Sequence, residues 1–441
     1  MNILHINASD ISGGAARAAY RIHRSLVEHG ASHALSSQIR VISQSSDDAT
    51  VISGQPSGQN PIRRRIRPRL AQQLLRDFRT GNPTSHSIAW PATGLGAELQ
   101  KHHRKGQADL VHLHWLGDCT LSIEEIGRLP MPLVWTLHDQ WAFCGAEHYT
   151  SPPLDGETAS SDERFAAGYS PASRPVHEAG PDLNRHTWLR KRRAWQRPIH
   201  IVCPSHWLAA CARRSTLMYD WRITVIPNPI DLAVWAPCEK VQARALLGLP
   251  ADRPLVLFGA MGGSSDPRKG ADLLLKALQL LRSQVAGTRL EQLELVVFGQ
   301  SRPVHLPDLG FPIHYSGYLH DDISLRLLYA ASDVFVIPSR QDNLPNTGLE
   351  AHACGTPVVA FASGGLVDIV DPNITGALAQ PFDPLSLATA IRWVLEDPQR
   401  RLQMAMAARQ RAERLWDTAR IAKMYVEVYR QAMESESRAP L

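Results

Sequence analysis

The chain alternates short apolar runs with longer segments in which apolar residues recur at helical spacing. An apolar run at Ile3–Ile6 comes first, and a loop with two glycines follows it. The next segment ends at Gly30 and carries apolar residues on one helical face: Ala15, Ala18, Ala19, Ile22 and Leu26. A strand, a glycine loop and a helix in this order form the opening unit of a parallel α/β domain.

The alternation continues along the chain and restarts once. In the first half, strands are expected at 109–116, 132–139 and 199–205, and the segment 225–231 ends that half. In the second half, strands are expected at 254–260, 293–299, 333–339 and 356–361. The pattern predicts the α/β class, with two Rossmann-like domains. Each would be a doubly wound parallel sheet, and the two would face each other across a cleft that holds the ligand.

The predicted domains are 1–238 and 239–415. Residues 416–441 read as a terminal helix, which we expect to pack back on the first domain; its apolar side carries Ile421, Met424, Tyr425 and Val428. The segment 150–184 interrupts the first domain, because it is rich in Pro, Gly, Ser, Asp and Glu and has almost no periodicity. A loop of this length predicts a lid or partial disorder until a ligand binds.

Composition agrees with two globular domains. The chain has 441 residues, of which 44% are hydrophobic and 20% are charged. No stretch approaches the ~20 apolar residues that span a bilayer, and the first residues lack the basic flank of a signal peptide. The six cysteines form no C-x-x-C pair, which argues against zinc and disulfide frameworks. A cytoplasmic location is expected, including the inner face of the membrane.

Positive charge is mild in total but concentrated in two runs. The net charge is +5, and arginines cluster at 61–69 and 189–197. One interpretation is a pair of solvated helix faces; the other is contact with phosphates on an anionic surface. Trp188 and Trp195 flank the second run, and leucines follow the first, which favours a membrane surface contacted through Arg63–Arg69 and Arg190–Arg197. No nucleic acid partner is expected.

Two loops in the second half carry candidate chemistry. The loop Gly262–Gly270 follows an expected strand, and its glycines, Arg268 and Lys269 suit a phosphate or diphosphate at a helix N-terminus. An ordinary strand-to-helix turn would show the same residues. The second loop places Asp342 at a strand end and Glu350 in an early turn of a helix that starts near Asn346 or Thr347. Carboxylates accept hydrogen bonds from sugar hydroxyls. The alternative interpretation is that Asp342 and Glu350 are ordinary surface acids.

The second loop also carries a family resemblance. Its D-x7-E spacing, followed by AHACGTPVVAFASGG, resembles the E-x7-E signature of retaining glycosyltransferases with the GT-B fold, the large family four. ISGGAARAAY resembles the glycine loop of that family, and DPRKG resembles its diphosphate-binding lysine motif. TLHDQWAFCGAEHY resembles the H-D-x-W-A-F segment of a subgroup that builds bacterial exopolysaccharide and colanic-acid-type polymers. The resemblance covers nearly the whole chain.

The resemblance implies a role for each matching residue. Glu350 would hold the donor ribose, Asp342 would contact the donor sugar, and Lys269 would neutralise the diphosphate as it leaves. His138 would reach the transferred sugar and the reaction centre. Together with Lys269, Asp342 and Glu350 it forms the predicted catalytic set. The remaining donor contacts are assigned to Gly13, Gly14, Gly262, Arg268, Leu319, Asn343, Leu344, Pro345, Asn346 and Thr347.

The resemblance also implies chemistry without a metal or other cofactor. Preorganised cations and helix N-termini stabilise the charge that develops on a departing diphosphate. No D-x-D motif stands at an expected strand end. The chain departs from the family pattern at Ala260, where an arginine is usual, at Asp342, which is one methylene shorter than Glu, and after Cys144, where no cysteine cluster follows. No general base is assigned.

His112 and His114 form an H-x-H pair that also occurs in metal sites. Strand alternation explains the spacing equally, and hydrogen-bonded histidines at a strand end are the favoured interpretation. His138 is favoured for function because Asp139 and Trp141 accompany it.

The sequence as a whole predicts a retaining glycosyltransferase. It would move a hexose from a nucleoside-diphosphate sugar to a saccharide or lipid-linked acceptor in surface polysaccharide synthesis. The alternatives are a sugar-nucleotide epimerase, a phosphorylase of the same architecture, or a non-catalytic membrane scaffold. A dehydrogenase is disfavoured, because the first glycine loop lacks G-x-G-x-x-G.

Overall fold

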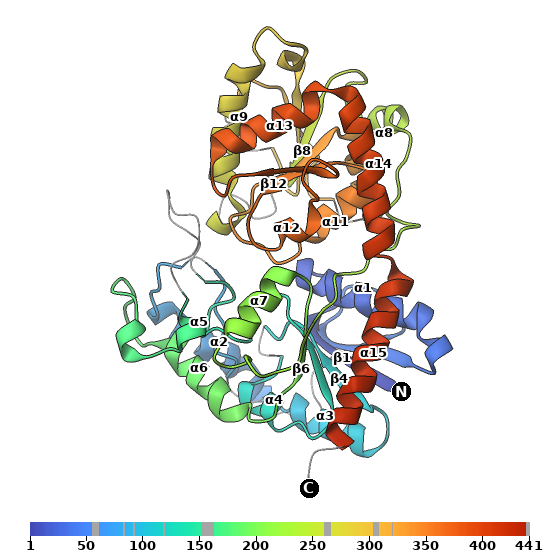
Figure 1. Cartoon of the computed structure of the whole chain (residues 1–441). Helices are drawn as coiled ribbons and strands as arrows, with labels where there is room; N and C mark the ends of the chain where they lie inside the picture. The colour runs from blue at the N-terminus through green and yellow to red at the C-terminus, as the bar shows by residue number, and fades with distance from the viewer. Residues whose placement is uncertain are drawn as a thin grey trace. The chain divides into compact units, whose positions relative to one another are not determined.

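The chain divides into two compact units, each built around its own parallel sheet (Figure 1). The computed structural model describes residues 1–54, 61–82, 84–90, 93–117, 120–150, 163–259, 266–302, 308–319 and 321–437. The first unit contains the described residues up to Pro229 and those from Thr418 onward, and the second contains Ile230–Asp417. Gly262 and Ala260 lie outside the described residues.

The first unit contains a sheet whose strands all run parallel, in the order β3-β2-β1-β4-β5-β6-β7. Its strands are β1 (Asn2–Ser9), β2 (Ser36–Ser43), β3 (Val51–Ser53), β4 (Leu110–Leu113), β5 (Leu133–Thr136), β6 (His200–Cys203) and β7 (Ile223–Val225). Its helices are α1 (Gly14–His29), α2 (Pro61–Asp77), α3 (Leu95–Arg104), α4 (Ile123–Gly127), α5 (Arg164–Ala167), α6 (Leu183–Ala194), α7 (His206–Arg214) and α15 (Thr418–Ser437), with single 3-10 turns at Ala31–His33 and Pro171–Ser173.

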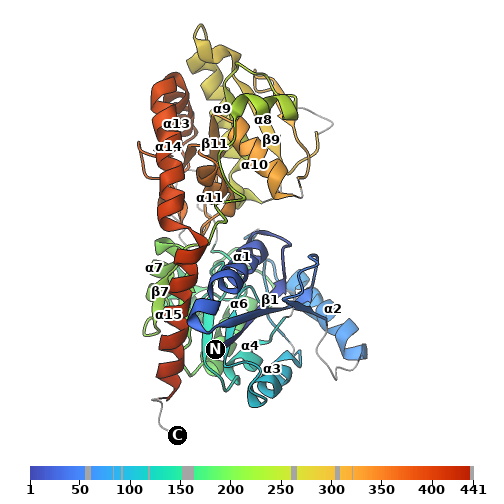
Figure 2. The same cartoon turned by 90° about the vertical axis from the view of Figure 1, so that its right-hand side faces the viewer.

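The central strands of this sheet are buried on both faces, as expected for a parallel sheet that helices cover on both sides. On one face Leu113, Trp135 and Ile201 pack with residues from α3, α4, α6 and α7. On the other face Ile3 and Val134 pack with residues of α1 and α15. The last helix of the chain therefore belongs to the core of the first unit, where it lies beside α1 (Figure 2).

The second unit contains a parallel sheet in the order β10-β9-β8-β11-β12-β13. Its strands are β8 (Leu255–Gly259), β9 (Glu294–Phe298), β10 (Ile313–Tyr315), β11 (Val334–Ile337), β12 (Val358–Phe361) and β13 (Gly376–Ala379). Its helices are α8 (Lys240–Leu247), α9 (Ala271–Val285), α10 (Asp322–Ala331), α11 (Asn346–Ala353), α12 (Leu366–Ile369), α13 (Pro384–Glu396) and α14 (Pro398–Leu415), with 3-10 turns η3 (Pro267–Lys269) and η4 (Arg289–Gln292).

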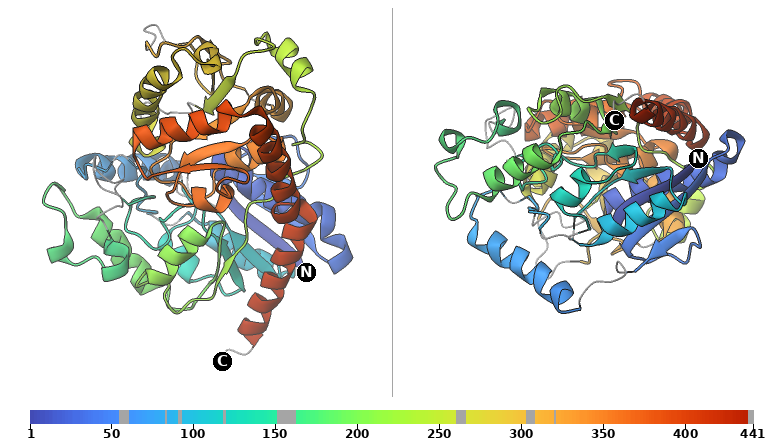
Figure 3. Two further views of the ribbon diagram at one scale, coloured as in Figure 1. Left: turned by 45° about the horizontal axis from the view of Figure 1, so that its top comes forward. Right: turned by 90° about the horizontal axis from the view of Figure 1, so that it is seen from below.

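Helices cover both faces of the second sheet as well (Figure 3). Val256, Val334 and Val336 pack with α9 and α13 on one face. Leu257 and Phe335 point to the other face and pack with α10 and α11. The predicted pair of doubly wound Rossmann-like domains is confirmed by these two sheets.

Both sheets reverse their strand order at one place. In the first unit β1 lies between β2 and β4, and in the second unit β8 lies between β9 and β11. The loops after adjacent strands diverge at such a point and leave a crevice outside the carboxyl ends of the strands. In the second unit these loops carry Lys269 after β8 and Asp342 after β11.

Part of the segment predicted to be partly disordered is ordered. Within 163–184, Arg164 donates two hydrogen bonds to Glu178, at 2.8 and 3.2 Å, and both side chains are buried. The hydroxyl of Tyr169 donates to Glu147, which is also buried. The polar composition suggested disorder, but the buried charges of this stretch pair with one another, and pairing offsets the cost of burying them.

None of the helices in the described part of the chain is long and apolar enough to cross a membrane.

Candidate active site

Lys269 and Asp342 come together at the carboxyl ends of β8 and β11. The ammonium of Lys269 donates to Asp342 Oδ2 at 2.6 Å, and the hydroxyl of Ser339 donates to the same oxygen at 3.3 Å. The backbone N–H of Asn343 donates to Asp342 Oδ1 at 3.2 Å, and Arg268 Nη1 lies 3.7 Å from that oxygen. Both oxygens of the carboxylate are therefore engaged, and Asp342 fixes the position of two cations.

The electrostatics of Asp342 follow from these neighbours. Burial alone would raise the pKa of Asp342, but the charges of Lys269 and Arg268 and the hydrogen bonds outweigh burial and hold its pKa below the ordinary value. The carboxylate is thus ionised at neutral pH. Lys269 keeps about a third of its side chain exposed (35%), whereas Asp342 keeps 10%. The cation, rather than the acid, is the more accessible partner.

Two glycines allow the loops around Asp342 to approach one another. Gly270 has a positive φ of 68°, and a Cβ at that position would lie 2.0 Å from the carbonyl oxygen of Pro338. Gly364 has a φ of 57°, and a Cβ there would lie 2.6 Å from the carbonyl oxygen of Asp342. The glycine of DPRKG therefore brings its lysine against the end of β11.

Glu350 lies on α11, which begins at Asn346 as predicted. The hydroxyl of Tyr329 donates to Glu350 Oε2 at 3.2 Å, and the residue is only 3% exposed. Leu344, just before the helix, packs into the apolar core with Leu349. Burial of these side chains fixes the start of α11 relative to β11.

A cavity of about 250 Å³ opens in the second unit at this point. Lys269, Gln300, Ser339, Asp342 and Thr347 supply its polar lining, and Pro345 lies beside them. The apolar lining comes mainly from Phe258, Leu274, Leu275, Val297, Phe298, Leu309, Ile313 and Tyr315. Four of the predicted site residues thus share one cavity.

Other predicted residues of the second unit lie around this cavity without lining it. Among the described residues, the lining does not include Glu350, Arg268, Leu319, Asn343, Leu344 or Asn346. Leu319 packs partly buried against the core cluster that contains Tyr329. It follows Gly317, whose carbonyl accepts a hydrogen bond of 2.7 Å from Gly299 at the end of β9.

In the first unit, His138 follows β5 and joins a line of histidines. His138 Nε2 lies 3.2 Å from Nδ1 of His114, and His114 Nε2 lies 2.9 Å from Nδ1 of His5. Strand alternation places the three side chains on one face, because each stands an even number of positions from Val134, Leu110 or Ile3. No pattern in the sequence predicted that His138 and His5 would be linked.

His112 lies beside this line but makes its own hydrogen bonds. Its Nδ1 lies 2.8 Å from the hydroxyl of Tyr429, and its Nε2 lies 2.8 Å from the hydroxyl of Thr136. Nitrogens of His5, His112 and His114 all lie within 4.8 Å of one another, which is close enough to consider a metal. Both ring nitrogens of His112 and of His114 already have hydrogen-bond partners, so the favoured interpretation of hydrogen-bonded histidines accounts for this geometry.

The glycine loop between β1 and α1 is tied to the rest of the unit through Asp10. The carboxylate of Asp10 accepts backbone hydrogen bonds from Ser45 and Ser46, the shortest at 2.7 Å. Gly13 has a positive φ of 93° and precedes the first turn of α1, which begins at Gly14. The loop thus presents its two glycines at the carboxyl end of β1.

Lys191 is a structural residue that sequence reasoning missed. Its buried ammonium donates to the carbonyls of Trp141, Cys144 and Gly145, the last at 2.7 Å, and lies 3.9 Å from the centre of the Trp141 ring. Burial lowers the pKa of Lys191 to about 7, although nearby acidic groups oppose the shift. Through these hydrogen bonds Lys191 holds the H-D-x-W-A-F segment, which begins at His138, in place.

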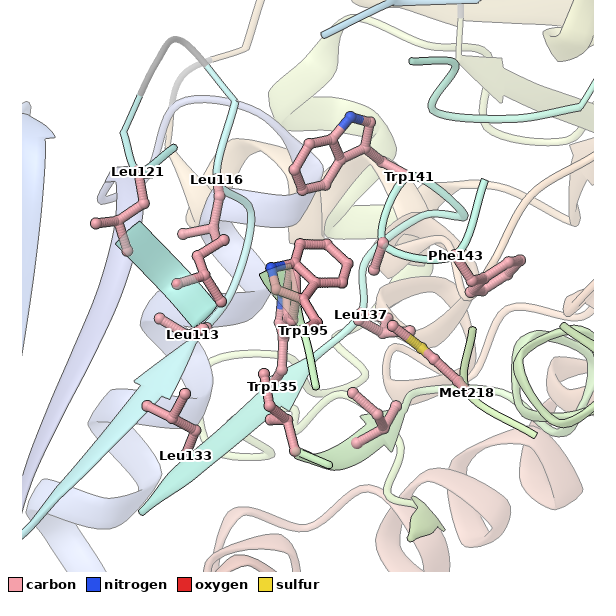
Figure 4. Packing of buried hydrophobic residues seen from close by; sticks show 14 of the residues in the cluster. Leu113, Leu116, Leu121, Leu133, Trp135, Leu137, Trp141, Phe143, Trp195 and Met218 are labelled. Atoms are coloured by element: carbon pink, nitrogen blue, oxygen red, sulfur yellow. The ribbon is translucent and has the colours of Figure 1, made fainter. Parts of the chain in front are cut away.

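The aromatic argument for membrane contact by the second arginine run is wrong. Trp188 and Trp195 are buried, and the Trp195 ring packs 5.3 Å from that of Trp135 in the core (Figure 4). Arg190 pairs with Glu124 at 2.8 Å. The spacing 184, 188, 191, 195 marks one buried face of α6, and this helical period was the signal that could have identified Lys191.

Comparison with known proteins places the chain in a family. A model described as "Glycosyltransferase Family 4" matches residues 12–234, and one described as "Glycosyl transferases group 1" matches residues 253–397. The chain is 36% identical over 369 residues to a D-inositol 3-phosphate glycosyltransferase of Xylanimonas cellulosilytica. The aligned region covers 78% of this chain and 76% of that protein. A protein of the same name from Kineococcus radiotolerans is 34% identical over 371 residues, with 79% and 77% covered.

Solved structures share the fold. Sucrose-phosphate synthase from Thermosynechococcus elongatus aligns with a TM-score of 0.65 and 20% identity, over 98% of this chain and 99% of that chain. Anabaena HepE in complex with UDP-glucose aligns with a TM-score of 0.61 and 18% identity, over 98% and 100%. The fold of two Rossmann-like units and the family matches define a glycosyltransferase of GT-B architecture. The chain belongs to glycosyltransferase family 4.

The histidines of the first unit predict a loss of stability in mild acid. Burial lowers the pKa of His23 and of His138 to about 4, whereas unfolded histidines titrate near 6.5. Between these values the unfolded chain binds protons that the folded unit excludes. Stability is therefore fully present above a pH of about 6.5 and decreases as the pH falls toward about 4.

Thermal melts between about pH 7.5 and about pH 4.5 would measure this loss as a falling Tm. The His23→Gln variant has one titrating group fewer, so its Tm should fall less over the same range. A wild-type Tm that stays constant or rises on acidification would contradict the expectation.

Proposed function

We propose that the enzyme is a retaining glycosyltransferase that moves a hexose from a nucleoside-diphosphate sugar to a hydroxyl of its acceptor. The observation that carries this proposal is the Lys269–Asp342 pair in the lining of a cavity outside the carboxyl ends of β8 and β11. A switch point of a parallel sheet is where such folds bind nucleotides. Family membership supports transfer over the epimerase, phosphorylase and scaffold alternatives.

The diphosphate would bind against Lys269. Its ammonium is partly exposed although paired, and Asp342 and the Gly270 turn fix its position before any ligand arrives. The N-terminus of α9 begins two residues later, at Ala271, and adds partial positive charge. A cation that is already oriented stabilises developing negative charge at little cost in reorganisation. Arg268 supports the same site by donating to the carbonyl of Gln341 at 2.9 Å.

The sugar and the ribose would bind along the start of α11. Pro345 and Thr347 line the cavity, and the backbone from Asn343 to Thr347 would contact sugar and phosphate oxygens. Glu350 would hold the ribose hydroxyls, and Leu319 would lie against the nucleobase. Because Asp342 is engaged by Lys269, we assign it first to positioning this cation and only then to a sugar hydroxyl.

The first unit would supply His138 to the transferred sugar, and Gly13 and Gly14 to the acceptor and diphosphate. His138 is part-exposed at the end of β5, and the glycine loop stands at the end of β1. No general base is assigned, because the departing phosphate can take the acceptor proton when both react on one face of the sugar.

For the donor we propose a UDP-sugar, which the complex of Anabaena HepE with UDP-glucose supports. For the acceptor two candidates stand. A polyol phosphate of the D-inositol 3-phosphate type is supported by the names of the relatives that match most of the chain. A lipid-linked saccharide of exopolysaccharide synthesis is supported by the TLHDQWAFCGAEHY segment. Parallel transfer assays with both acceptors would separate them.

Replacing Lys269 should remove most of the activity. We expect Lys269→Ala to lower transfer by ~10²–10³-fold, because the diphosphate loses its oriented cation. Glu350→Gln, which keeps the size of the side chain and its contact with Tyr329, should weaken donor binding. Thermal shifts with UDP-, GDP- and ADP-sugars would identify the donor, and radiolabelled transfer would give the rates.

Lys276→Ala is the matched control, since Lys276 is exposed on α9 and lies outside the cavity lining. It should behave as wild type. Wild-type turnover in a folded Lys269→Ala variant would refute the assigned site.

We also propose that transfer needs no divalent metal. The cavity lining presents one carboxylate, and that carboxylate is neutralised by Lys269. EDTA should therefore leave the initial rate unchanged, because Lys269 supplies the positive charge at the diphosphate. A sharp loss of rate in EDTA, restored by added Mg²⁺ or Mn²⁺, would contradict this.

Peripheral membrane contact is proposed through α2 alone. Ile66, Leu70 and Leu74 are 47%, 44% and 39% exposed, and their spacing of four places them on one side of the helix. Ala71 and Phe78 face a small core cluster instead. An apolar stripe on an arginine-rich helix is typical of a helix that lies in a membrane interface. The run at 190–197 is no longer part of this proposal.

Replacing Ile66, Leu70 and Leu74 by serine should reduce co-flotation with phosphatidylglycerol vesicles, because these side chains would no longer bury apolar area in the bilayer. A matched control is Leu402→Ser with Met406→Ser, two exposed apolar residues four positions apart on α14 and outside the cavity lining. Equal flotation of the α2 variant and wild type would reduce α2 to a solvated helix.

A further inference from the structure

We propose that His5 and His114 are positioning residues that set the tautomer of His138, so that His138 keeps its proton on Nδ1 and acts as a hydrogen-bond donor. The three imidazoles form one hydrogen-bonded line, which we call the histidine file. This inference deepens the proposed function, since it rests on His138 reaching the donor sugar. Its first test is independent of activity.

The histidine file consists of two hydrogen bonds, each of which holds one proton. Nδ1 of His5 lies 2.9 Å from Nε2 of His114, and Nδ1 of His114 lies 3.2 Å from Nε2 of His138. Two imidazole nitrogens at such distances share one N–H, so one donates and the other accepts. The tautomer of one ring therefore fixes the tautomer of the next.

Burial keeps the file neutral. His5 and His114 are 0% and 1% exposed, whereas His138 is intermediate. Desolvation holds the pKa values of His5 and His114 well below the ordinary value, and neighbouring histidines lower them further. Three neutral rings carry three N–H protons. Two protons occupy the two hydrogen bonds, and the third must lie at one end of the file.

The two ends of the file differ in their surroundings. At the inner end, His5 Nε2 is buried and has no hydrogen-bond partner among the residues that the structure describes. At the outer end, His138 Nδ1 belongs to a partly exposed residue. A buried N–H without an acceptor is rarer than a buried acceptor without a donor. The third proton is therefore placed on His138 Nδ1, and both shared protons point from His5 toward His138.

The surrounding groups leave this file intact. The His112 ring lies tilted with its centre 4.1 Å from that of His114, but its nitrogens bind the hydroxyls of Tyr429 and Thr136. His23 lies edge-on to His5 at 5.6 Å, and its nitrogens lie 2.8 Å from the hydroxyls of Ser37 and Thr50. Both histidines pack against the file without entering its hydrogen bonds.

This arrangement has a chemical consequence for the reaction. With Nε2 occupied by the proton of His114, His138 cannot accept a proton there, and its Nδ1 already carries one. His138 then supplies an N–H to an oxygen of the sugar or diphosphate and is excluded as the base that deprotonates the acceptor. The positioning resembles that of any histidine whose second nitrogen is fixed by a buried partner.

Nitrogen NMR of the full-length protein with ¹⁵N-labelled histidine tests the file directly. Two-bond ¹H–¹⁵N correlations distinguish Nδ1–H from Nε2–H rings, and the His138 signals are identified by their loss in His138→Gln. We expect the Nδ1–H pattern for His138, His114 and His5 near neutral pH without any substrate. An Nε2–H pattern at His138, or one metal ion per chain by elemental analysis, would overturn the proposal.

His114→Phe provides the second test, because it removes the donor to His138 and keeps a ring of similar shape. We expect the His138 Nε2 signal to move to the shift of a nitrogen that accepts no hydrogen bond, because the ring loses its buried donor, and kcat to fall at least about tenfold with little change in donor KM. His23→Gln is the matched control, since it removes a buried histidine outside the file; its His138 signals and kcat should match wild type.

The outcomes separate this inference from the proposed function. An Nδ1–H pattern at His138 in a protein that transfers no sugar would leave the file standing and refute the function. An Nε2–H pattern in an active enzyme would refute the file alone. If His114→Phe does not fold, the wild-type spectrum still tests the tautomer of His138.

Discussion

Parallel strands deliver their following loops to a single edge of the sheet, and the candidate chemistry of this enzyme depends on that constraint. In the second unit β8 and β11 are neighbours, so a lysine and an aspartate that are 73 residues apart come within 2.6 Å. In the first unit the middle of β1 and the residues that follow β4 and β5 bring together His5, His114 and His138. Neither set is local in sequence, and neither would meet on an antiparallel hairpin sheet.

At each edge one charged or polar group is used to hold another. The carboxylate of Asp342 pairs with Lys269 and Arg268, so that a cation is oriented at the cavity before any ligand binds. The ammonium of Lys191 donates hydrogen bonds to three carbonyls of the segment after His138. Such pairing offsets the cost of burying each ion, because a buried charge without a partner would destabilise the unit by several kcal/mol.

Much of the fold and part of the site could be predicted from the sequence. Apolar runs with helical segments between them predicted two parallel sheets, and the loop positions predicted that Lys269 and Asp342 would stand at strand ends. The strand Ser36–Ser43 was not predicted, because five of its eight residues are polar. The ion pair itself, the engaged state of Asp342 and the histidine file depend on register between distant strands, which periodicity cannot provide.

Other differences arise from burial that composition conceals. The run Leu189–Arg197 looks like a basic surface, yet Lys191 and Trp195 are in the core because α6 has one buried face. The stretch after 163 looks like a solvated loop, yet Arg164 and Glu178 neutralise each other there. A charge count treats every arginine or lysine as exposed, whereas helical phase decides which of them face the interior.

The position of α15 has a consequence for how the protein is made. Ile421, Tyr425 and Tyr429 complete the core under β4 and β5, so one core spans nearly the full length of the polypeptide. The ribosome synthesises Ile230–Asp417 before it reaches these residues. During translation the unit that starts later can close first, while the earlier one waits with an apolar groove uncovered. Assembly of the first unit is thus coupled to the synthesis of α15.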